Sequence, residues 1–91
     1  MLTFLQNNPY AVMQELKERA KSRRKYLKLS QKELSTRADV SLGSLKRFEQ
    51  SGQISLEALL KLSVVLECLE DFNGVCVKRE VMPSSIEDLM L

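Results

Sequence analysis

The sequence predicts an all-α fold, a bundle of four to five helices with a short C-terminal strand or arm and a small terminal helix. Apolar residues recur every three or four positions, and Ser or Asn precedes each such run, which is typical of capped helices. The composition agrees with one small domain, because 91 residues with 44% hydrophobic and 29% charged content leave no room for a second core.

The first helix is expected to begin at Pro9. Asn8 can cap the free N–H groups of the first turn, and proline at the first helical position loses no hydrogen bond. One face of this helix is apolar except for Arg24; its other members are Val12, Leu16, Ala20 and Leu27. An arginine in that position can cover the core with its stem while its charged end reaches solvent.

The second helix, residues 31–38, follows a capping box in which Ser30 and Glu33 satisfy each other's backbone N–H groups. It should end at Asp39, because aspartate tolerates the left-handed conformation that a tight turn needs. Ser41 then caps a third helix, residues 42–50. Its core side carries Leu45 and Phe48, and the opposite side carries Ser44, Lys46 and Arg47.

Ser55 caps a fourth helix whose apolar positions extend to Leu69, and whose apolar surface is large enough to predict burial on two sides. Beyond it, β-branched residues at 75, 77 and 81 favour a short strand or arm. Ser84 and Glu87 form a second capping box before the terminal helix. The predicted organisation is an N-terminal arm (1–8), a helical domain (9–71) and a C-terminal tail (72–91).

The composition makes an enzyme improbable. There is no histidine and no glycine-rich phosphate loop, so no catalytic centre, metal or cofactor is expected. Cys68 and Cys76 fit neither a zinc pair nor a disulfide framework, which favours reduced thiols over the alternative of redox sensing. No run of 18 apolar residues exists, so no membrane span and no membrane partner are expected.

The net charge of +2 conceals a division along the chain. Residues 15–53 hold eleven Lys or Arg against five Asp or Glu, whereas residues 54–91 hold three against seven. The helices at 31–38 and 42–50, joined by a short turn, make a helix-turn-helix unit. The excess positive charge therefore lies on the helices that would face DNA phosphates.

The stretch SQKELSTRADVSLGSLKRFEQSGQISLEALLKLSVVL resembles the helix-turn-helix of the Xre family, which comprises lambda-repressor-like and Cro-like bacterial DNA-binding proteins. The resemblance covers about residues 14–69 and rests on Gln31-x-x-Leu34, Val40-Ser41, Phe48-Glu49 and Leu59 to Leu62. It implies a lambda-repressor-like bundle that binds double-stranded operator DNA in the bacterial cytoplasm, on the nucleoid. It departs from the family at Asp39, where glycine is usual in the turn.

The resemblance also implies the DNA-binding residues. The glutamine that opens the second helix binds a phosphate, which corresponds to Gln31, with Lys32 beside it. The recognition helix reads the major groove through residues corresponding to Ser41, Leu42, Gly43, Ser44, Lys46 and Arg47. Leu42 can make only an apolar contact with a base edge, and Gly43 has no side chain. We therefore expect Arg47 to read a guanine through O6 and N7.

Three of these positions have alternative interpretations. Lys46 and Arg47 could form a solvated face, as charged residues on an isolated helix usually do. Gly43 could be required by a neighbouring helix or by close approach of the DNA backbone. The resemblance further pairs Arg24 with Glu49 between the first and third helices, in place of a surface-exposed arginine.

A homodimer is expected from the surplus apolar surface, with Phe72, Val75, Val77 and Val81 as its candidate dimer or partner residues. Such a dimer would place two recognition helices about 34 Å apart on a palindromic site.

The string SLGSLKRFEQSGQISLEALLKL and the tail PSSIEDLML are similar to HipB-like antitoxins, which are encoded beside HipA-type kinase toxins. This similarity implies a repressor in a type II toxin-antitoxin operon that holds a HipA-like kinase through surfaces away from the DNA. Segment 75–81 would then pair across the dimer. Two alternatives are a free-standing Xre-family repressor without a toxin, and a protein-interaction module that has lost DNA binding.

Overall fold

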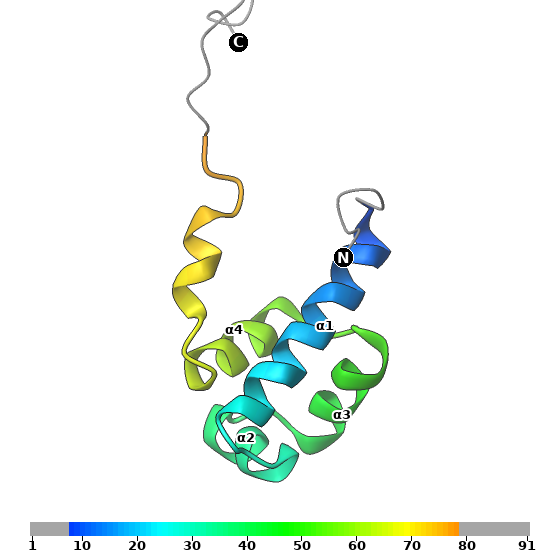
Figure 1. The fold of residues 1–91 in the computed structure, drawn as a ribbon, viewed down its shortest axis with the longest axis vertical. Coiled ribbons are helices and arrows are strands. Elements are labelled where there is room, and N and C mark those ends of the chain that lie inside the picture. The colour runs from blue at the N-terminus through cyan, green and yellow to red at the C-terminus, as the bar shows by residue number, and fades with distance from the viewer. Residues whose placement is uncertain (1–7, 79–91) are drawn as a thin grey trace, which may run out of the picture.

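The computed structural model describes residues 8–78, and helices are the only regular secondary structure in this part of the chain (Figure 1). Its elements are α1 (Pro9–Tyr26), α2 (Gln31–Ala38), α3 (Leu42–Ser51), α4 (Leu56–Val65) and a 3-10 helix, η2 (Leu69–Gly74). The predicted all-α bundle is confirmed. Residues 1–7 of the expected arm, Val81 and the expected terminal helix lie outside the described residues. None of the helices in residues 8–78 is long and apolar enough to cross a membrane.

The predicted helix starts are confirmed by their capping hydrogen bonds. Asn8 Oδ1 accepts from the N–H of Ala11 at 2.8 Å, and Ser55 Oγ accepts from the N–H of Ala58 at 3.1 Å. Ser30 and Glu33 form the complete capping box, with distances of 2.8 and 3.0 Å. Each cap satisfies a backbone donor that the first turn of a helix cannot satisfy itself.

Helices α1, α2 and α4 end in the same way, with one left-handed residue after the last turn. These residues are Lys28 (φ 60°), Asp39 (φ 56°) and Glu67 (φ 62°). The next residue then donates its N–H to a carbonyl five positions earlier, which is the Schellman pattern. The three bonds are Leu29 to Arg24 (3.1 Å), Val40 to Ser35 (3.1 Å) and Cys68 to Ser63 (3.0 Å). The left-handed Asp39 confirms the expected turn.

The fourth helix is shorter than the sequence indicates, and the expectation that it extends to Leu69 was wrong. Helix α4 ends at Val65 because Glu67 turns left-handed, and η2 begins only at Leu69. Arg23 of α1 holds this end by donating from Nε to the carbonyl of Leu66 at 2.8 Å. Burial on two sides is also absent within the described chain, since Leu56 and Val64 are 67% and 59% exposed.

The described part of the expected strand, residues 75–78, contains no strand. The N–H of Val75 donates to the carbonyl of Phe72 at 3.1 Å, and Cys76 has a φ of 60°. The backbone therefore turns immediately after η2, which outweighs the β-branched composition of this segment.

The core lies between α2, α3 and α4, with α1 packed across α3 (Figure 1). Phe48 and Leu45 of α3, Leu34 of α2 and Leu62 of α4 are each at most 1% exposed. The remaining buried apolar residues are Leu29, Ala38, Val40 and Leu66. Because α2 and α3 share this core, the orientation of one relative to the other is set by packing.

Gly43 in the first turn of α3 and Gly52 directly after its last residue provide a matched test of this packing. Gly52 ends α3 with φ 84°, and a Cβ there would lie 3.1 Å from both the Met13 carbonyl oxygen and Gln14 Nε2. A Cβ on Gly43 would meet nothing within 4 Å. We expect Gly52→Ala to lower the free energy of unfolding by about 1–2 kcal/mol or more, from the left-handed backbone alone. We expect Gly43→Ala to raise it by up to about 0.5–1 kcal/mol. Urea unfolding would contradict this account if both substitutions acted in the same direction.

Candidate nucleic-acid interface

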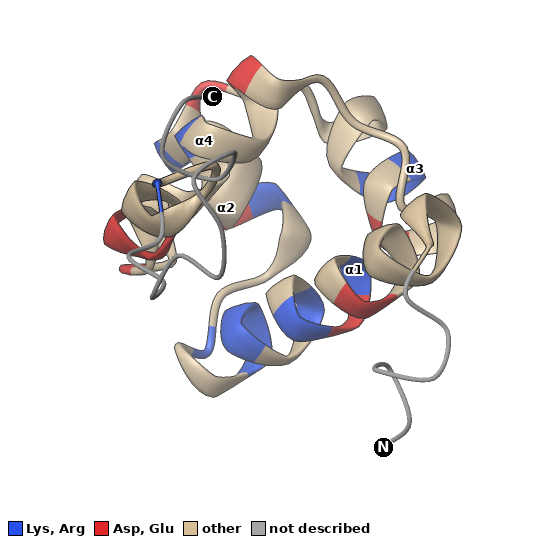
Figure 2. Cartoon of the chain, turned by 90° about the horizontal axis from the view of Figure 1, so that it is seen from above, with Lys and Arg blue, Asp and Glu red and all other residues tan. Residues whose placement is uncertain are grey.

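One exposed face of α3 carries Gly43, Lys46, Arg47 and Gln50. Lys46, Arg47 and Gln50 follow Gly43 by three, four and seven positions. All four residues therefore lie along one side of the helix, away from the buried Phe48. Figure 2 shows Lys and Arg on α3 and along α1. Gln50 was not among the predicted site residues, although its spacing of seven from Gly43 is a signal that the sequence contains.

Hydrogen bonds within the first turn of α3 use part of the hydrogen-bonding capacity of its serine hydroxyls. Ser41 Oγ accepts from the N–H of Ser44 at 3.1 Å and donates to Ser44 Oγ at 2.8 Å. The Ser41 hydroxyl is thus used to begin the helix, whereas the Ser44 hydroxyl keeps its proton for an outside acceptor. Both residues are exposed, and Leu42 beside them is half-buried.

The N-terminus of α2 exposes Lys32 and a half-buried Gln31. The N–H groups of these two residues begin the helix and have no intrahelical acceptor, so this end favours an anion. The side chain of Gln31 is held from behind, because its Nε2 donates to Glu49 Oε1 at 2.9 Å. This contact was not predicted for Gln31, which the sequence analysis assigned only to a phosphate.

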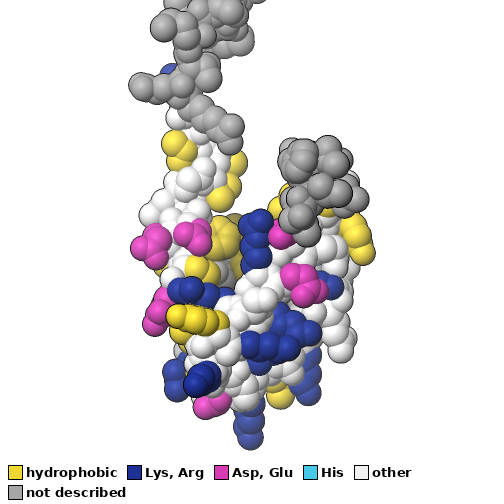
Figure 3. Space-filling view, in the orientation of Figure 1, with side chains coloured by type: hydrophobic (Ala, Val, Ile, Leu, Met, Phe, Trp, Pro, Cys, Tyr) yellow, Lys and Arg dark blue, Asp and Glu magenta, His cyan; other side chains and the backbone are white. Residues whose placement is uncertain are grey.

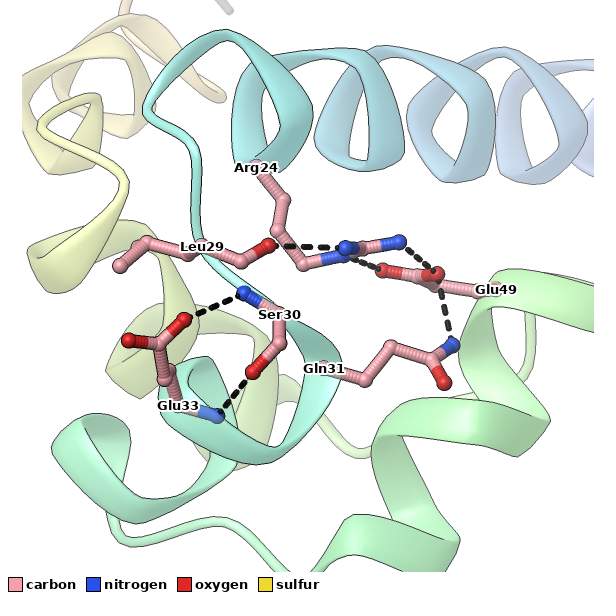
Figure 4. Close-up of polar contacts among 6 residues, drawn as sticks. All are labelled: Arg24, Leu29, Ser30, Gln31, Glu33 and Glu49. Atoms are coloured by element: carbon pink, nitrogen blue, oxygen red, sulfur yellow. Dashed lines mark hydrogen bonds and ion pairs between the residues drawn. The ribbon is translucent and has the colours of Figure 1, made fainter.

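A buried ion pair joins α1 to α3 (Figure 4). Arg24 contacts Glu49 through two bonds, Nε to Oε2 at 2.7 Å and Nη2 to Oε1 at 2.9 Å. Its third nitrogen, Nη1, donates to the carbonyl of Leu29 at 2.9 Å. The two side chains are 10% and 4% exposed, so the surface-exposed interpretation of Arg24 does not apply. The pair links α1, the loop before α2, the start of α2 and α3 in one network.

The network keeps Glu49 ionised. Burial acts to raise its pKa, but the hydrogen bonds from Arg24 and Gln31, with attraction to Arg24 and Lys21, outweigh burial and lower the pKa below its ordinary value of 4.5. Glu33 also has a lowered pKa, because its carboxylate accepts from the backbone N–H and the side chain of Ser30.

We therefore expect stability to fall in acid. A carboxyl whose pKa is lower in the folded chain contributes its full stabilisation above its unfolded value, here 4.5, and loses it as the pH falls through the lowered pKa. Urea unfolding between about pH 6 and about pH 3 should show a smaller loss of stability for Glu49→Gln than for the unmodified chain. Glu33→Gln serves as a control, because Glu33 is the second carboxyl with a lowered pKa and its contribution must be measured separately. Equal pH slopes for Glu49→Gln and the unmodified chain would contradict the prediction.

Side chains of α1 also hold the C-terminal end of α3. Gln14 Nε2 donates to the carbonyl of Ser51 at 2.8 Å, and Lys17 Nζ donates to the carbonyl of Gln50 at 3.3 Å. The sequence analysis missed both residues, because contacts between a side chain and a backbone more than 30 positions away leave no periodic signal. They place α3 at a defined position along α1.

A protein-family model described as Helix-turn-helix matches residues 21–72, more than half of the 91-residue chain. The chain belongs to the Xre and lambda-repressor-like helix-turn-helix family. The matched domain of this helix-turn-helix protein is a DNA-binding regulatory domain and not a catalytic one. The matched range contains both α2 and α3 completely. Neither the curated proteins nor the solved structures include a significant match.

The predicted dimer or partner residues are distributed over three environments. Phe72 is half-buried in η2, and Val75 and Val77 are 61% and 57% exposed beyond it. Val81 lies outside the described residues. The two cysteines are free thiols, of which Cys68 is half-buried and Cys76 exposed.

Proposed function

We propose that this helix-turn-helix protein is a sequence-specific regulator of transcription that places α3 in the major groove of an operator. The observation that carries the proposal is the outward face of α3, on which Lys46 and Arg47 are exposed. Neither side chain pairs with a carboxylate of residues 8–78. Two unpaired cations on a recognition helix that is held at its far end by Gln14 are suited to a polyanion.

The exposed residues of α2 and α3 divide two roles in this proposal, base recognition and phosphate binding. Arg47 donates two hydrogen bonds to a guanine, and Leu42 contacts a thymine methyl group. Lys46, Lys32 and the first N–H groups of α2 bind phosphates, which position the protein without reading sequence. The hydroxyl of Ser44, which keeps its proton, and the amide of Gln31 complete the phosphate contacts, with Gln31 oriented by its bond to Glu49. Ser41 contributes by capping α3 and orienting Ser44.

Gly43 supports close approach by the duplex. A side chain at this position would meet no atom of the described chain within 4 Å, so packing against a neighbouring helix does not require glycine. The remaining interpretation is that DNA passes close to the backbone of the first turn. Gly43→Ala should then weaken operator binding although it stabilises the fold. If Gly43→Ala bound the operator as tightly as the unmodified chain in a titration, Gly43 would have no role in close approach of the DNA.

The regulator acts as a homodimer in this proposal. Leu56, Leu60 and Val64 share the side of α4 opposite the buried Leu62, and Leu56 and Val64 are mostly exposed. A surface stripe of this kind is a candidate protein interface. Sedimentation should give a dimer for the unmodified chain and a monomer for Val64→Glu, which changes an exposed residue and leaves the core intact. A monomer at all concentrations would rule out this interface.

The finer assignment is the antitoxin of a HipBA-like operon. It is supported by the similarity of residues 41–62 to HipB-like antitoxins and by the acidic excess of residues 54–91, which suits a basic partner. Affinity purification of the tagged full chain from its host should recover a HipA-like kinase encoded beside it. Recovery of the chain without a kinase would favour the free-standing repressor.

The main proposal is tested by selection from random DNA duplexes. The protein should enrich a two-fold symmetric sequence whose half-sites are about one helical turn, 10–10.5 bp, or a multiple of it apart. The control protein for this selection is Arg19→Ala on α1. Gly52→Ala is unsuitable as a control because it alters the fold. Enrichment of no sequence would favour the protein-interaction module.

A further inference from the structure

An apolar groove of about 660 Å³ lies between α1 and the α4–η2 segment (Figure 3). One wall is formed by Val12, Leu16 and Ala20 of α1, which follow one another at intervals of four residues and therefore make one ridge along the helix. The other wall carries Leu59 of α4 and Phe72 of η2. Val12 is 39% exposed, so part of this apolar ridge has no partner within residues 8–78.

The groove is separate from the outward face of α3. Arg19 lines the groove from the side of α1 that is opposite Lys17, and Lys17 is the residue that contacts α3. The groove and the α3 face can therefore be occupied at the same time.

The two edges of the groove carry opposite charges. Arg19 and Arg23 lie on the α1 edge, and Glu67 and Asp71 lie on the edge across from them. No ion pair of residues 8–78 joins the two edges, because Arg19 pairs with Glu15 of its own helix and neither acidic side chain of the far edge forms an ion pair. Both edges thus keep charges that a bound molecule can pair with.

Between these edges the described groove offers few polar atoms. The hydroxyl of Ser63, which lies in the groove lining, already donates to the carbonyl of Leu59 at 2.8 Å. An extended peptide would therefore bring unpaired backbone N–H and C=O groups against apolar walls, at a cost in free energy. A helix pairs its backbone groups internally and can present one apolar stripe between two charged flanks. The groove is accordingly suited to a helix.

We propose that this groove binds an amphipathic helix of a partner protein. The helix has apolar residues at positions i, i+4 and i+7, acidic residues along the flank that faces the arginine edge, and basic residues along the flank that faces Glu67 and Asp71. Phe72 and Val75, two of the dimer or partner residues predicted from the sequence, both line the groove. The inference goes beyond the proposed DNA recognition and does not depend on it.

A second copy of the described chain is a poorer occupant. Its exposed apolar stripe is that of Leu56, Leu60 and Val64 on α4. Glu57 and Lys61 lie on the same side of that stripe and pair with each other at 3.7 Å, so α4 does not offer one acidic and one basic flank. A contact between the stripe of one copy and the groove of the next would also be heterologous, which leads to rings or open chains and not to a dimer.

The proposal is tested by selecting from a displayed library of helical peptides about 14 residues, or four turns, long on the unmodified full chain. Enriched peptides should carry the apolar stripe with one acidic and one basic flank. In anisotropy titrations Arg19→Glu should weaken their binding by about three- to tenfold, because a rim attraction becomes a repulsion. Arg37→Glu is the matched control, since Arg37 is exposed on α2 and does not line the groove. Its affinity for the peptide should not change.

A charge exchange makes this test more specific. A peptide whose acidic flank is replaced by lysine should bind Arg19→Glu more tightly than it binds the unmodified chain, because the attraction is restored with its sign reversed. Val12→Glu places a charge on the apolar ridge and should weaken the original peptide by at least about tenfold. Val12 is absent from the residues packed against the core, so this variant should keep the fold.

Two native thiols report where the peptide binds. Cys68 lines the groove and Cys76 does not. A bound peptide should slow the reaction of Cys68 with a thiol reagent by at least about tenfold at saturation and leave Cys76 unchanged. Enrichment of no peptide, equal binding to Arg19→Glu and Arg37→Glu, or an unchanged Cys68 rate would overturn the proposal. Protection of Cys68 that increases with protein concentration in the absence of peptide would overturn it too, because a second copy would then fill the groove.

Discussion

Arg24→Ala is expected to unfold much of the protein at temperatures where the unmodified chain is folded. The substitution leaves the Glu49 carboxylate, 4% exposed, without its bidentate partner, and leaves the Leu29 carbonyl without a donor. Removing one member of a buried pair costs about 3–5 kcal/mol. Small domains have only about 5–15 kcal/mol of stability. Thermal unfolding followed by circular dichroism should show a midpoint more than about 10 °C lower.

Two variants distinguish the loss of the buried ion pair from the loss of an arginine as such. Arg19→Ala removes an arginine whose side chain is 67% exposed, and should shift the midpoint by no more than about a few degrees, since exposed pairs contribute about 0–1 kcal/mol. The double variant Arg24→Met with Glu49→Leu should recover part of the lost stability, because it removes the uncompensated buried charge but leaves the Leu29 carbonyl and the Gln31 amide without these partners. A midpoint for Arg24→Ala equal to that of Arg19→Ala would contradict the structural role of the pair.

Arg47→Ala is expected to have the largest effect on DNA recognition. Its guanidinium is exposed at the middle of the α3 face, one turn beyond Gly43, where a bidentate contact to guanine contributes about 1–3 kcal/mol. Operator affinity should fall by about 5- to 150-fold, and preference at one base pair should be lost. Lys46→Ala should instead weaken binding to all sequences and reduce the salt dependence by about one phosphate contact.

Arg19→Ala again serves as the control, because it removes the same charge from the side of α1 opposite Lys17. Its operator affinity should stay close to that of the unmodified chain. Anisotropy titrations would contradict the assignment of Arg47 if Arg47→Ala and Arg19→Ala bound the operator equally well. Both chains should keep the thermal midpoint of the unmodified protein, since both side chains are exposed.

The helix-turn-helix unit could be predicted closely because its signals are local. The capping box of Ser30 and Glu33, the left-handed Asp39 and the cap at Ser41 each involve residues within four positions of one another. The start of α1 at Pro9 follows from the same kind of signal. These hydrogen bonds form in the chain segment itself, so the sequence contains their complete pattern.

The end of α4 could not be predicted, because it depends on a distant residue. Leucines continue past Val65, at positions 66 and 69, but Glu67 takes a left-handed conformation although it is neither glycine nor asparagine. Arg23, more than 40 positions earlier, holds that turn through the Leu66 carbonyl. The contacts of Gln14 with α3 and of Gln31 with Glu49 were missed for the same reason. In each case tertiary packing decides what local propensity leaves undetermined.

The central claim is that the α2–α3 face binds DNA by sequence. It is tested most directly by measuring the affinity of the unmodified full chain for the DNA upstream of its own gene and for a shuffled duplex of the same composition, over a range of salt concentrations. The account predicts at least about 1,000-fold tighter binding to the native sequence. The logarithm of the binding constant should fall with the logarithm of salt concentration by about 0.9 per phosphate contacted. Absence of binding at low salt, or equal affinity for both duplexes, would contradict the account.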